Sequence, residues 1–475
     1  MYKVLSNSGY KIKKSEHTCK EIHDIKKDLT VNPFTYGEFD KKDTKFTVFL
    51  ESPHKLYVPR YYGIEKFGEP NETKFTEPEQ IHVSFNGTLR PEQVPIAQLY
   101  LESAKKIGGG LISLKCGGGK TVLALYLAAT LKLKTIVLVH KDFLMTQWRD
   151  RISEFLPDAK IGKVQQNTID IVGKDIVLAM VQSLSMKEYP ENSFSSFGLA
   201  IFDECHHLGA EVFHRCMGKV ATRYSLGLSA TPNRKDGLRK VFEWYIGPMV
   251  YMTTDKNTDY IEVRIHNYTH DSETYNRSET IYNGKPCYPR MINNICEFKP
   301  RQDFIFDLVV KEHTLGRKIL ILSDRRDFLS KMRDSLNLYH QNISGLYVGG
   351  MRPETLRESQ EKDIILGTFS MASEGMDIPK LNTIVLASPK SDVVQSVGRI
   401  LREKSDKRKF HPLVIDIRDT HPNLRFFEKQ CEKRIKFYHQ QNYDVCQHDG
   451  GTVSKIDKKK RGRKPVHKMD CLIED

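Results

Sequence analysis

Short apolar runs that alternate with helical stretches constrain the fold of this chain more than any other feature. Runs of this length between amphipathic helices are typical of buried strands in parallel sheets, which helices cover on both faces. Five runs lie before residue 250, namely LISLK, TIVLV, DIVLAMV, LAIFD and SLGLSA. Five more lie after residue 300, namely KILILS, SGLYVG, DIILGT, NTIVLAS and PLVIDI. The pattern predicts an α/β protein with two tandem units, each built on a doubly wound parallel sheet.

The segments outside these two units predict a small accessory domain, a connector and a tail. The N-terminal segment has Lys-rich polar stretches, scattered aromatic residues and several prolines, and no motif in it indicates a function. The connector is polar and loses the strand–helix rhythm, with one strand expected around Tyr260 to His266. The C-terminal tail is Lys-rich, which predicts disorder. The expected segments are residues 1–85, 86–250, 251–300, 301–450 and 451–475.

The basic charge of the chain is concentrated near its C-terminus. The formal net charge of +14 favours a polyanionic partner, although solubility alone would explain it about equally well. Eight Lys or Arg residues and the single acidic Asp457 lie between Lys455 and Lys468. We interpret this tail as a non-specific electrostatic arm for nucleic acid. An AT-hook-like minor-groove element, a nuclear-import signal and a solvated charge run are the alternatives.

The composition also predicts where the chain is found. No apolar stretch approaches the roughly 20 residues that span a bilayer, and the N-terminus has no apolar core of a signal peptide. Nine cysteines form no CxxC pair, which favours reduced thiols over disulfides or zinc. A soluble, intracellular protein with no membrane partner is expected.

The segment LISLKCGGGKTVLALYLAA predicts a phosphate-binding loop between a strand and a helix. Glycines let backbone N–H groups approach phosphate oxygens, and the helix directs its N-terminus at them. Lys120 would reach the β and γ phosphates of ATP, and the Thr121 hydroxyl would hold Mg²⁺. A Gly-rich turn without ligand is the alternative, and Leu114 stands where the general pattern has glycine. The expected nucleotide-binding residues of the loop are Leu114, Lys115, Cys116, Gly117, Gly118, Gly119, Lys120 and Thr121.

The segment LAIFDECHH predicts the metal and water site. It ends an apolar strand in two carboxylates, at the edge where open α/β sheets bind ligands. Asp203 would hold Mg²⁺ and Glu204 would orient and deprotonate the attacking water, although a solvated acidic turn is the alternative. We expect a coupling role for His206 rather than metal binding, because no paired Cys or His lies nearby. Its expected partners are Ser229, Ala230 and Thr231.

Together these motifs resemble those of the superfamily 2 DExH-box helicases. LGLSATP is similar to helicase motif III, VLVHKDFLMTQW to motif Ia and VQSL to motif Ib. DIILGTFSMASEGMDIP is similar to motif V and DVVQSVGRILRE to motif VI. In LRPEQ, Arg90 and Gln93 stand where this superfamily reads adenine. The resemblance covers residues from about 85 to 420 and implies two RecA-like domains that share an ATP site.

The resemblance also implies roles for residues of the second half. Arg399 and Arg402 would stabilise charge on the transferring phosphoryl group, and Gln395 would lie one turn earlier on the same helical face. An ordinary helix with solvated arginines is the alternative. Gly375 and Asp377, with Glu374, are expected in a loop that contacts the nucleotide or the domain interface. Thr368 is expected to face the nucleic-acid backbone.

SATPNRKDGL and LYVGGM resemble one subgroup of these helicases. It contains XPB-like repair helicases, phage recombination helicases and the poxvirus-type transcript-release helicases of large cytoplasmic DNA viruses, and the chain's length resembles the viral group most. The subgroup implies an ATP-dependent motor on DNA, with RNA polymerase or transcription factors as partners. It would act in a cytoplasmic viral factory, in the virion or, given the KKKRGRK tail, in the nucleus. An RNA helicase and a nucleic-acid clamp without hydrolysis are the alternatives.

Overall fold

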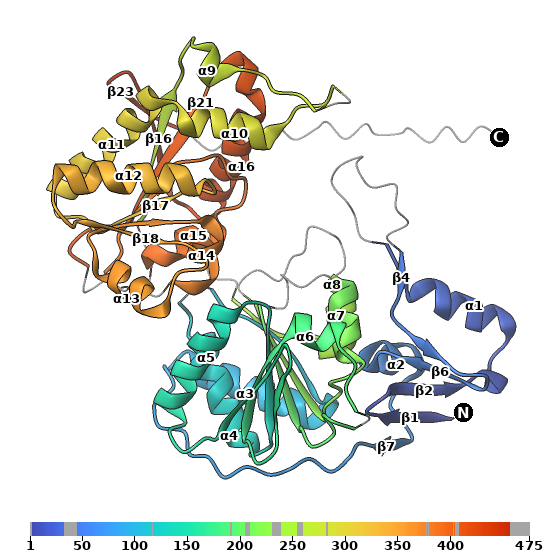
Figure 1. Cartoon of the computed structure of the whole chain (residues 1–475). Helices are drawn as coiled ribbons and strands as arrows, with labels where there is room; N and C mark the ends of the chain where they lie inside the picture. The colour runs from blue at the N-terminus through green and yellow to red at the C-terminus, as the bar shows by residue number, and fades with distance from the viewer. Residues whose placement is uncertain are drawn as a thin grey trace, which may run out of the picture. The chain divides into compact units, whose positions relative to one another are not determined.

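The computed structural model forms two compact units, Met1–Asp255 and Lys256–Asp475. Within the described ranges, each unit contains an eight-stranded sheet covered by helices (Figure 1). The described residues are 2–32, 45–115, 117–190, 192–204, 210–229, 239–253, 260–281, 284–376, 378, 380–401, 403 and 408–456.

The first sheet confirms the five apolar runs predicted before residue 250. Its strand order is β11-β10-β12-β9-β13-β14-β8-β15, and the five predicted strands pair in parallel. They are β8 (Gly109–Ser113), β9 (Thr135–Val139), β12 (Ile176–Met180), β13 (Leu199–Asp203) and β14 (Tyr224–Ser229). Three further strands, which the sequence pattern did not reveal, are β10 (Ile161–Gln165), β11 (Thr168–Asp170) and β15 (Met249–Met252).

Helices cover both faces of this sheet, so it is doubly wound. Alternate residues along the strands pack into two separate apolar clusters, one on each face. One cluster takes in α3 (Gln93–Ile107), α4 (Lys120–Leu131) and α5 (Asp142–Phe155). The other takes in α6 (Val181–Met186), α7 (Ala210–Met217) and α8 (Arg239–Ile246). Burial on both faces explains why these strands are apolar throughout.

The described residues of the N-terminal segment form a five-stranded sheet, of order β5-β6-β2-β1-β7, a two-stranded sheet of β3 and β4, and two α-helices. Its core is continuous with that of the first α/β sheet, so it belongs to the first compact unit. The Tyr62 and Trp244 rings meet edge to face, and the Tyr245 hydroxyl donates to the Val48 carbonyl at 3.2 Å. The elements are β1 (Lys3–Ser6), β2 (Gly9–Lys13), α1 (Cys19–Asp28), β3 (Thr30–Val31), β4 (Phe46–Thr47), β5 (Leu50–Glu51), β6 (Lys55–Val58), α2 (Arg60–Phe67) and β7 (Glu72–Lys74).

The second sheet, of order β18-β19-β17-β20-β21-β16-β22-β23, confirms the five runs predicted after residue 300. Those strands are β17 (Ile319–Leu322), β18 (Ser344–Tyr347), β19 (Ile364–Gly367), β20 (Thr383–Leu386) and β21 (Leu413–Asp419). The longer helices are α10 (Tyr288–Glu297), α11 (Lys299–Thr314), α12 (Arg326–Tyr339), α13 (Pro353–Glu361) and α16 (Arg425–Gln440). The short helices are α9 (Glu273–Asn276), α14 (Phe369–Gly375) and α15 (Val394–Val397).

Two expected boundaries differ from the structure. Residues 260–300 are part of the second unit rather than a separate connector, because β16 (Glu262–Tyr268) pairs with β21 and β22 (Asp444–Asp449). The strand expected around Tyr260 to His266 is thus confirmed as β16, but it belongs to the second sheet. The predicted tail also begins within structure, since β23 (Thr452–Lys455) pairs with β22. The rest of the tail, from residue 457, lies outside the described residues.

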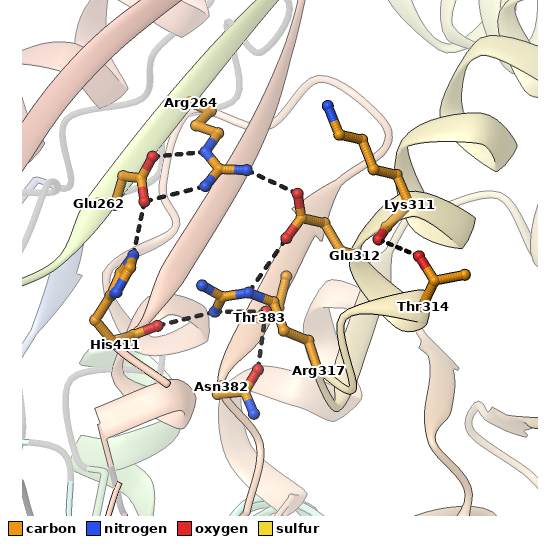
Figure 2. Close-up of polar contacts among 9 residues, drawn as sticks. All are labelled: Glu262, Arg264, Lys311, Glu312, Thr314, Arg317, Asn382, Thr383 and His411. Atoms are coloured by element: carbon orange, nitrogen blue, oxygen red, sulfur yellow. Dashed lines mark hydrogen bonds and ion pairs between the residues drawn. The ribbon is translucent and has the colours of Figure 1, made fainter. Parts of the chain in front are cut away.

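A charged network ties β16 to its neighbours (Figure 2). Arg264 donates to Glu262 at 2.6 Å and to Glu312 of α11 at 2.7 Å, and His411 lies 2.7 Å from Glu262. Arg317 donates to the His411 carbonyl at 2.9 Å and lies 3.2 Å from Glu312. These contacts anchor the segment after residue 260 within the second unit.

None of the helices in the described ranges is both long and apolar enough to cross a membrane.

Candidate active site

The predicted phosphate loop joins β8 to α4. Gly117 and Gly119 have φ of +76° and +74°, in the left-handed region that favours glycine. A Cβ on Gly119 would lie only 2.4 Å from the Gln93 amide nitrogen, so a larger residue there would displace the Gln93 side chain and strain the backbone. The Gly118 N–H donates to the Lys115 carbonyl at 3.0 Å and closes the turn. Helix α4 begins immediately afterwards at Lys120. The first backbone N–H groups of the helix therefore point at the loop.

Leu114 departs from the general loop pattern without disturbing this turn. Its side chain is buried in the apolar cluster between the sheet and α4. Its N–H donates to the carbonyl of Ser229, at the end of the neighbouring β14, at 3.1 Å. The loop therefore accepts a core-filling leucine at position 114, where the general pattern has glycine. Cys116 lies outside the described residues.

The two predicted carboxylates meet the loop at the carboxyl edge of the sheet. Strand β14 lies between β13 and β8 and is parallel to both. Asp203 at the end of β13 and Ser113 at the end of β8 therefore lie at the same edge of the sheet. Lys120 Nζ lies 2.6 Å from Glu204 Oε1, and both side chains are mostly buried. Glu204 has φ of +46°, in the left-handed region that is uncommon for residues other than glycine. The structure thus brings together the loop lysine and the carboxylate predicted to activate water.

Asp203 is buried and held by an aromatic donor. The Trp148 indole N–H donates to its Oδ2 at 2.8 Å. Burial first, and then the charge of Glu204, raises the pKa of Asp203 to about 6, against the opposing effect of Lys120. Oδ1 has no hydrogen-bond partner among the described residues. A carboxylate oxygen of this kind, beside the start of α4 where Thr121 lies, fits Mg²⁺, which prefers oxygen ligands.

Trp148 was missed by the sequence reasoning. It lies on α5 at helical spacing with Leu144, Met145 and Ile152, all of them buried. That pattern indicates an ordinary apolar face, and the side chain does pack in the core. Its polar edge supplies the contact with Asp203, and only the position of this helix beside β13 reveals it.

The predicted adenine-reading residues contact the loop main chain. Gln93 is buried, and its amide nitrogen donates to the carbonyls of Gly118 and Gly119 at 3.1 Å each. Its Oε1 accepts the Arg90 N–H at 3.0 Å, and the Arg90 guanidinium donates to the Gly117 carbonyl at 3.0 Å. These residues therefore position the phosphate loop, in addition to any contact with a base.

The predicted coupling residues are only partly described. Ser229 ends β14, is buried and accepts the Leu114 N–H through its carbonyl. This links the beginning of the predicted coupling segment directly to the phosphate loop. His206, Ala230 and Thr231 lie outside the described residues.

In the second unit, Arg399 is buried and its guanidinium donates to the Met376 carbonyl at 2.9 Å. Helix α15 is short and contains Gln395, and Arg399 follows in a 3-10 helix, Gly398–Leu401. The continuous helix that was expected is therefore a single α-turn followed by 3-10 structure. Arg402 and Asp377 lie outside the described residues.

The expected loop after β19 is a helix instead. Glu374 and Gly375 lie in the last turn of α14. The helix forms because the Thr368 hydroxyl caps its N-terminus by accepting the Met371 N–H at 3.4 Å. Thr368 therefore has a structural contact where only nucleic-acid contact was expected.

Comparison with known proteins identifies the family. A family model of the res subunit of type III restriction enzymes matches residues 86–234, and a model of the helicase conserved C-terminal domain matches residues 301–404. A protein of Acanthamoeba polyphaga mimivirus, named as an ATP-dependent RNA helicase, is 36% identical over 93% of this chain and 86% of its own length. This chain belongs to the superfamily 2 helicases of large DNA viruses.

Other viral relatives of this helicase are more distant. A protein of Invertebrate iridescent virus 6, named as a helicase, is 27% identical over 75% of this chain and 82% of its own length. A protein of African swine fever virus, named as an ATP-dependent RNA helicase, is 24% identical over 74% of this chain and 72% of its own length. The helicase is accordingly a nucleic-acid-dependent ATPase.

A solved structure supports the fold. A fragment from Vibrio vulnificus, named as the HsdR subunit of a type I restriction enzyme, has a TM-score of 0.53 and 19% identity. The match covers 78% of this helicase and 71% of the fragment. With the parallel order of both sheets, it shows the tandem RecA-like architecture expected from the sequence.

Proposed function

We propose that this helicase is a DNA motor that hydrolyses ATP between Lys120 and Glu204 and converts each cycle into movement along DNA. The observation that supports the site most strongly is the 2.6 Å contact between these two side chains, beside buried Asp203. They reach one point from α4 and from the end of β13. A lysine and a carboxylate paired in this way can exchange partners when a phosphate arrives.

The exchange gives each residue a defined role. The γ-phosphate of ATP would take over Lys120, and this would release Glu204 to accept a proton from the attacking water. Asp203 and Thr121 would hold Mg²⁺, which neutralises charge on the β and γ phosphates when bound. Arg90 and Gln93 would hold the loop in shape while the phosphates bind.

The second domain would supply the remaining positive charge. Arg399 and Arg402, with Gln395, would stabilise the transferring phosphoryl group from the other side of the nucleotide. Gly375 and Asp377 would act near the nucleotide or the domain interface. Closure of the domains on ATP and reopening after hydrolysis would step them along one strand.

We propose DNA as the polymer along which the motor moves, because two observations favour it. The subgroup that SATPNRKDGL and LYVGGM resemble acts on DNA, and the family model of residues 86–234 is that of a restriction enzyme subunit. Transcript release in a viral factory or virion, with RNA polymerase as partner, is the corresponding proposal for its role. RNA is the second candidate, because the mimivirus and African swine fever virus relatives are named as RNA helicases.

Steady-state ATPase assays with single-stranded DNA, duplex DNA and RNA of matched length test the choice. The proposal expects either form of DNA to stimulate hydrolysis more than RNA does. Stronger stimulation by RNA would assign the motor to RNA. No stimulation by any polymer, with ATP still bound, would favour a clamp without hydrolysis.

A further inference from the structure

The accessory domain has a sheet face that the active site does not use. Strands β2 and β6 alternate strictly, so Ile12 and Leu56 are fully buried beneath α1 and α2. Lys11, Lys13 and Lys55 lie on the opposite face, where Lys13 is the direct cross-strand partner of Lys55. We define this surface as the Lys–Tyr face, formed by Tyr2, Lys11, Lys13, Lys55 and Tyr57.

Tyrosine rings hold the lysines of this face without neutralising them. The ammonium groups of Lys13 and Lys55 lie 4.8 and 5.1 Å from the centre of the Tyr2 ring, and that of Lys11 lies 5.7 Å from the Tyr57 ring. Lys55 also donates to the Tyr2 hydroxyl at 3.4 Å. Within the described part of the chain, none of the three ammonium groups has a carboxylate partner. Cation–π contacts position a cation but leave its charge available.

The fold alone does not explain this arrangement. Like charges directly opposite each other on neighbouring strands reduce stability. Lysines that protect a sheet from aggregation are expected on edge strands, whereas β2 lies in the middle of the order β5-β6-β2-β1-β7. The edge strands carry ion-paired charges instead: Lys74 of β7 lies 2.9 Å from Glu72, and Glu51 of β5 lies 2.8 Å from Lys26.

We propose that the Lys–Tyr face is a second nucleic-acid contact, which binds the phosphate backbone of the DNA on which the motor acts. This inference rests on the proposed function. Lys11 and Lys13, two residues apart on one strand, are separated by about 6.6 Å, so the face can contact more than one phosphate. Because the lysine ammonium groups lie over the tyrosine rings, we expect the face to bind through electrostatic contacts rather than through stacking of bases on the rings. Contacts of this kind are independent of sequence.

The attachment of the accessory domain makes such a contact useful to the motor. The Arg60 guanidinium donates to the Arg223 carbonyl at 2.8 Å, and the Asn7 amide donates to the Ala221 carbonyl at 3.0 Å. Trp244 of α8 packs against Tyr62 of α2. DNA bound to the Lys–Tyr face would therefore be attached to the same compact unit as the first RecA-like domain.

The test compares three combined variants of the full-length chain with the wild type. Binding of labelled duplex DNA, single-stranded DNA and RNA is measured by fluorescence anisotropy over a series of salt concentrations, alongside thermal unfolding and unstimulated ATPase. The face variant replaces its three lysines with glutamine, and a conservative variant replaces them with arginine. The matched control removes the same charge from the helices on the other side of the sheet. Its substitutions are Lys20→Gln, Lys27→Gln and Lys66→Gln.

The face variant should lose about two to three units from the slope of log affinity against log salt. Between about 50 and 200 mM salt, the wild type should then lose about 40-fold more affinity than this variant does. The control and arginine variants should keep the wild-type slope. The face variant should be at least as stable as the wild type, because the repulsion between Lys13 and Lys55 is removed.

A face variant with the wild-type slope, or a control variant with an equal loss, would overturn the proposal. Binding of the same variants to anionic lipid vesicles is measured in parallel. If the face variant lost vesicle binding but kept the wild-type slope of log DNA affinity against log salt, the proposal would also be overturned, because the face would then recognise a membrane surface. Failure of the proposed function would appear differently, as absent DNA stimulation of ATPase in the wild-type chain.

Discussion

The two RecA-like units use buried charge in different ways. In the first, Lys120 lies 2.6 Å from Glu204, and their side chains are 13% and 16% exposed. In the second, Arg434 makes two contacts with Asp416, at 2.8 and 2.7 Å, and both side chains are almost completely buried. The Tyr438 hydroxyl also donates to Asp416 at 2.9 Å. This second pair is closed off from solvent and fixed, whereas the first pair is partly exposed and can open for a ligand.

A second pair in the same unit reinforces this contrast. Arg301 donates twice to Asp419, at 2.7 and 2.9 Å, and once to the Ala387 carbonyl at 2.9 Å. The Tyr275 hydroxyl also donates to Asp419. The network of Figure 2 likewise joins strands to helix α11 through Arg264 and Glu312. Ion pairs of the second unit therefore stabilise its fold, and the pair in the first unit is expected to work in catalysis.

The largest expected effect is that of Lys120→Ala, because the γ-phosphate loses its main protein cation. Turnover should fall by more than about 1,000-fold, or about 4 kcal/mol. Steady-state ATPase with saturating nucleic acid measures it. Lys106→Ala, at an exposed position of α3, removes the same charge and should leave turnover unchanged. Near-wild-type turnover in Lys120→Ala would remove the phosphate-loop assignment.

Arg434→Met should act on stability instead. Asp416 would be left as a buried carboxylate without its cation, which costs about 3–5 kcal/mol. Combining it with Asp416→Leu should recover most of that loss, since an apolar pair can replace a buried ion pair. Denaturant unfolding of the full-length chain gives the free energies. A single variant within about 1 kcal/mol of the wild type would show that this pair is as exchangeable as the first.

Arg399→Ala tests whether an arginine of the second unit also joins catalysis. Turnover should fall about 100-fold while ATP affinity stays within a few-fold, because its contact would form mostly in the transition state. Its contact with the Met376 carbonyl would have to open for this. A large loss of ATP affinity with unchanged turnover would instead indicate phosphate binding in the ground state.

Gln93→Ala should have a smaller effect on the first site. Its amide holds the carbonyls of Gly118 and Gly119, and a lost hydrogen bond to a buried group costs about 1–3 kcal/mol. The KM for ATP should rise about tenfold, and the preference for ATP over GTP should weaken. An unchanged KM for both nucleotides would show that the loop keeps its shape without this contact.

The basic tail should have the smallest effect on catalysis. The strand pairing of β23 places the deletion after Ile456, so that the sheet remains intact. Unstimulated ATPase should be unchanged, while the slope of log DNA affinity against log salt should become shallower by several units. A larger loss on A·T-rich than on G·C-rich duplex would support an AT-hook-like element. An unchanged slope would leave an import signal or a solvated tail.

The sequence predicted what depends on periodicity and on spacing along the chain. All ten runs became strands because they are buried on both faces. The strand order places Lys120 beside Glu204, and the roles predicted for these two residues stay predictions. The alternating strands of the accessory domain were missed, because short strands that are buried on one face resemble polar segments. The strand expected around Tyr260 to His266 is β16, but its pairing with β21 and β22 was not foreseen. Trp148 and the loop contacts of Gln93 depend on tertiary position, which no local pattern encodes.

The central claim is that Lys120 exchanges Glu204 for phosphate, and Glu204→Gln tests it most directly. Equilibrium ATP binding and single-turnover hydrolysis are measured on the same preparation, beside Lys120→Ala. The variant should bind ATP at least as tightly as the wild type, because ATP no longer has to break the ion pair between Lys120 and residue 204. Hydrolysis should be slower by a factor of about 100 to 10,000, since an amide accepts no proton. ATP binding as weak as that of Lys120→Ala, or hydrolysis at the wild-type rate, would contradict the account.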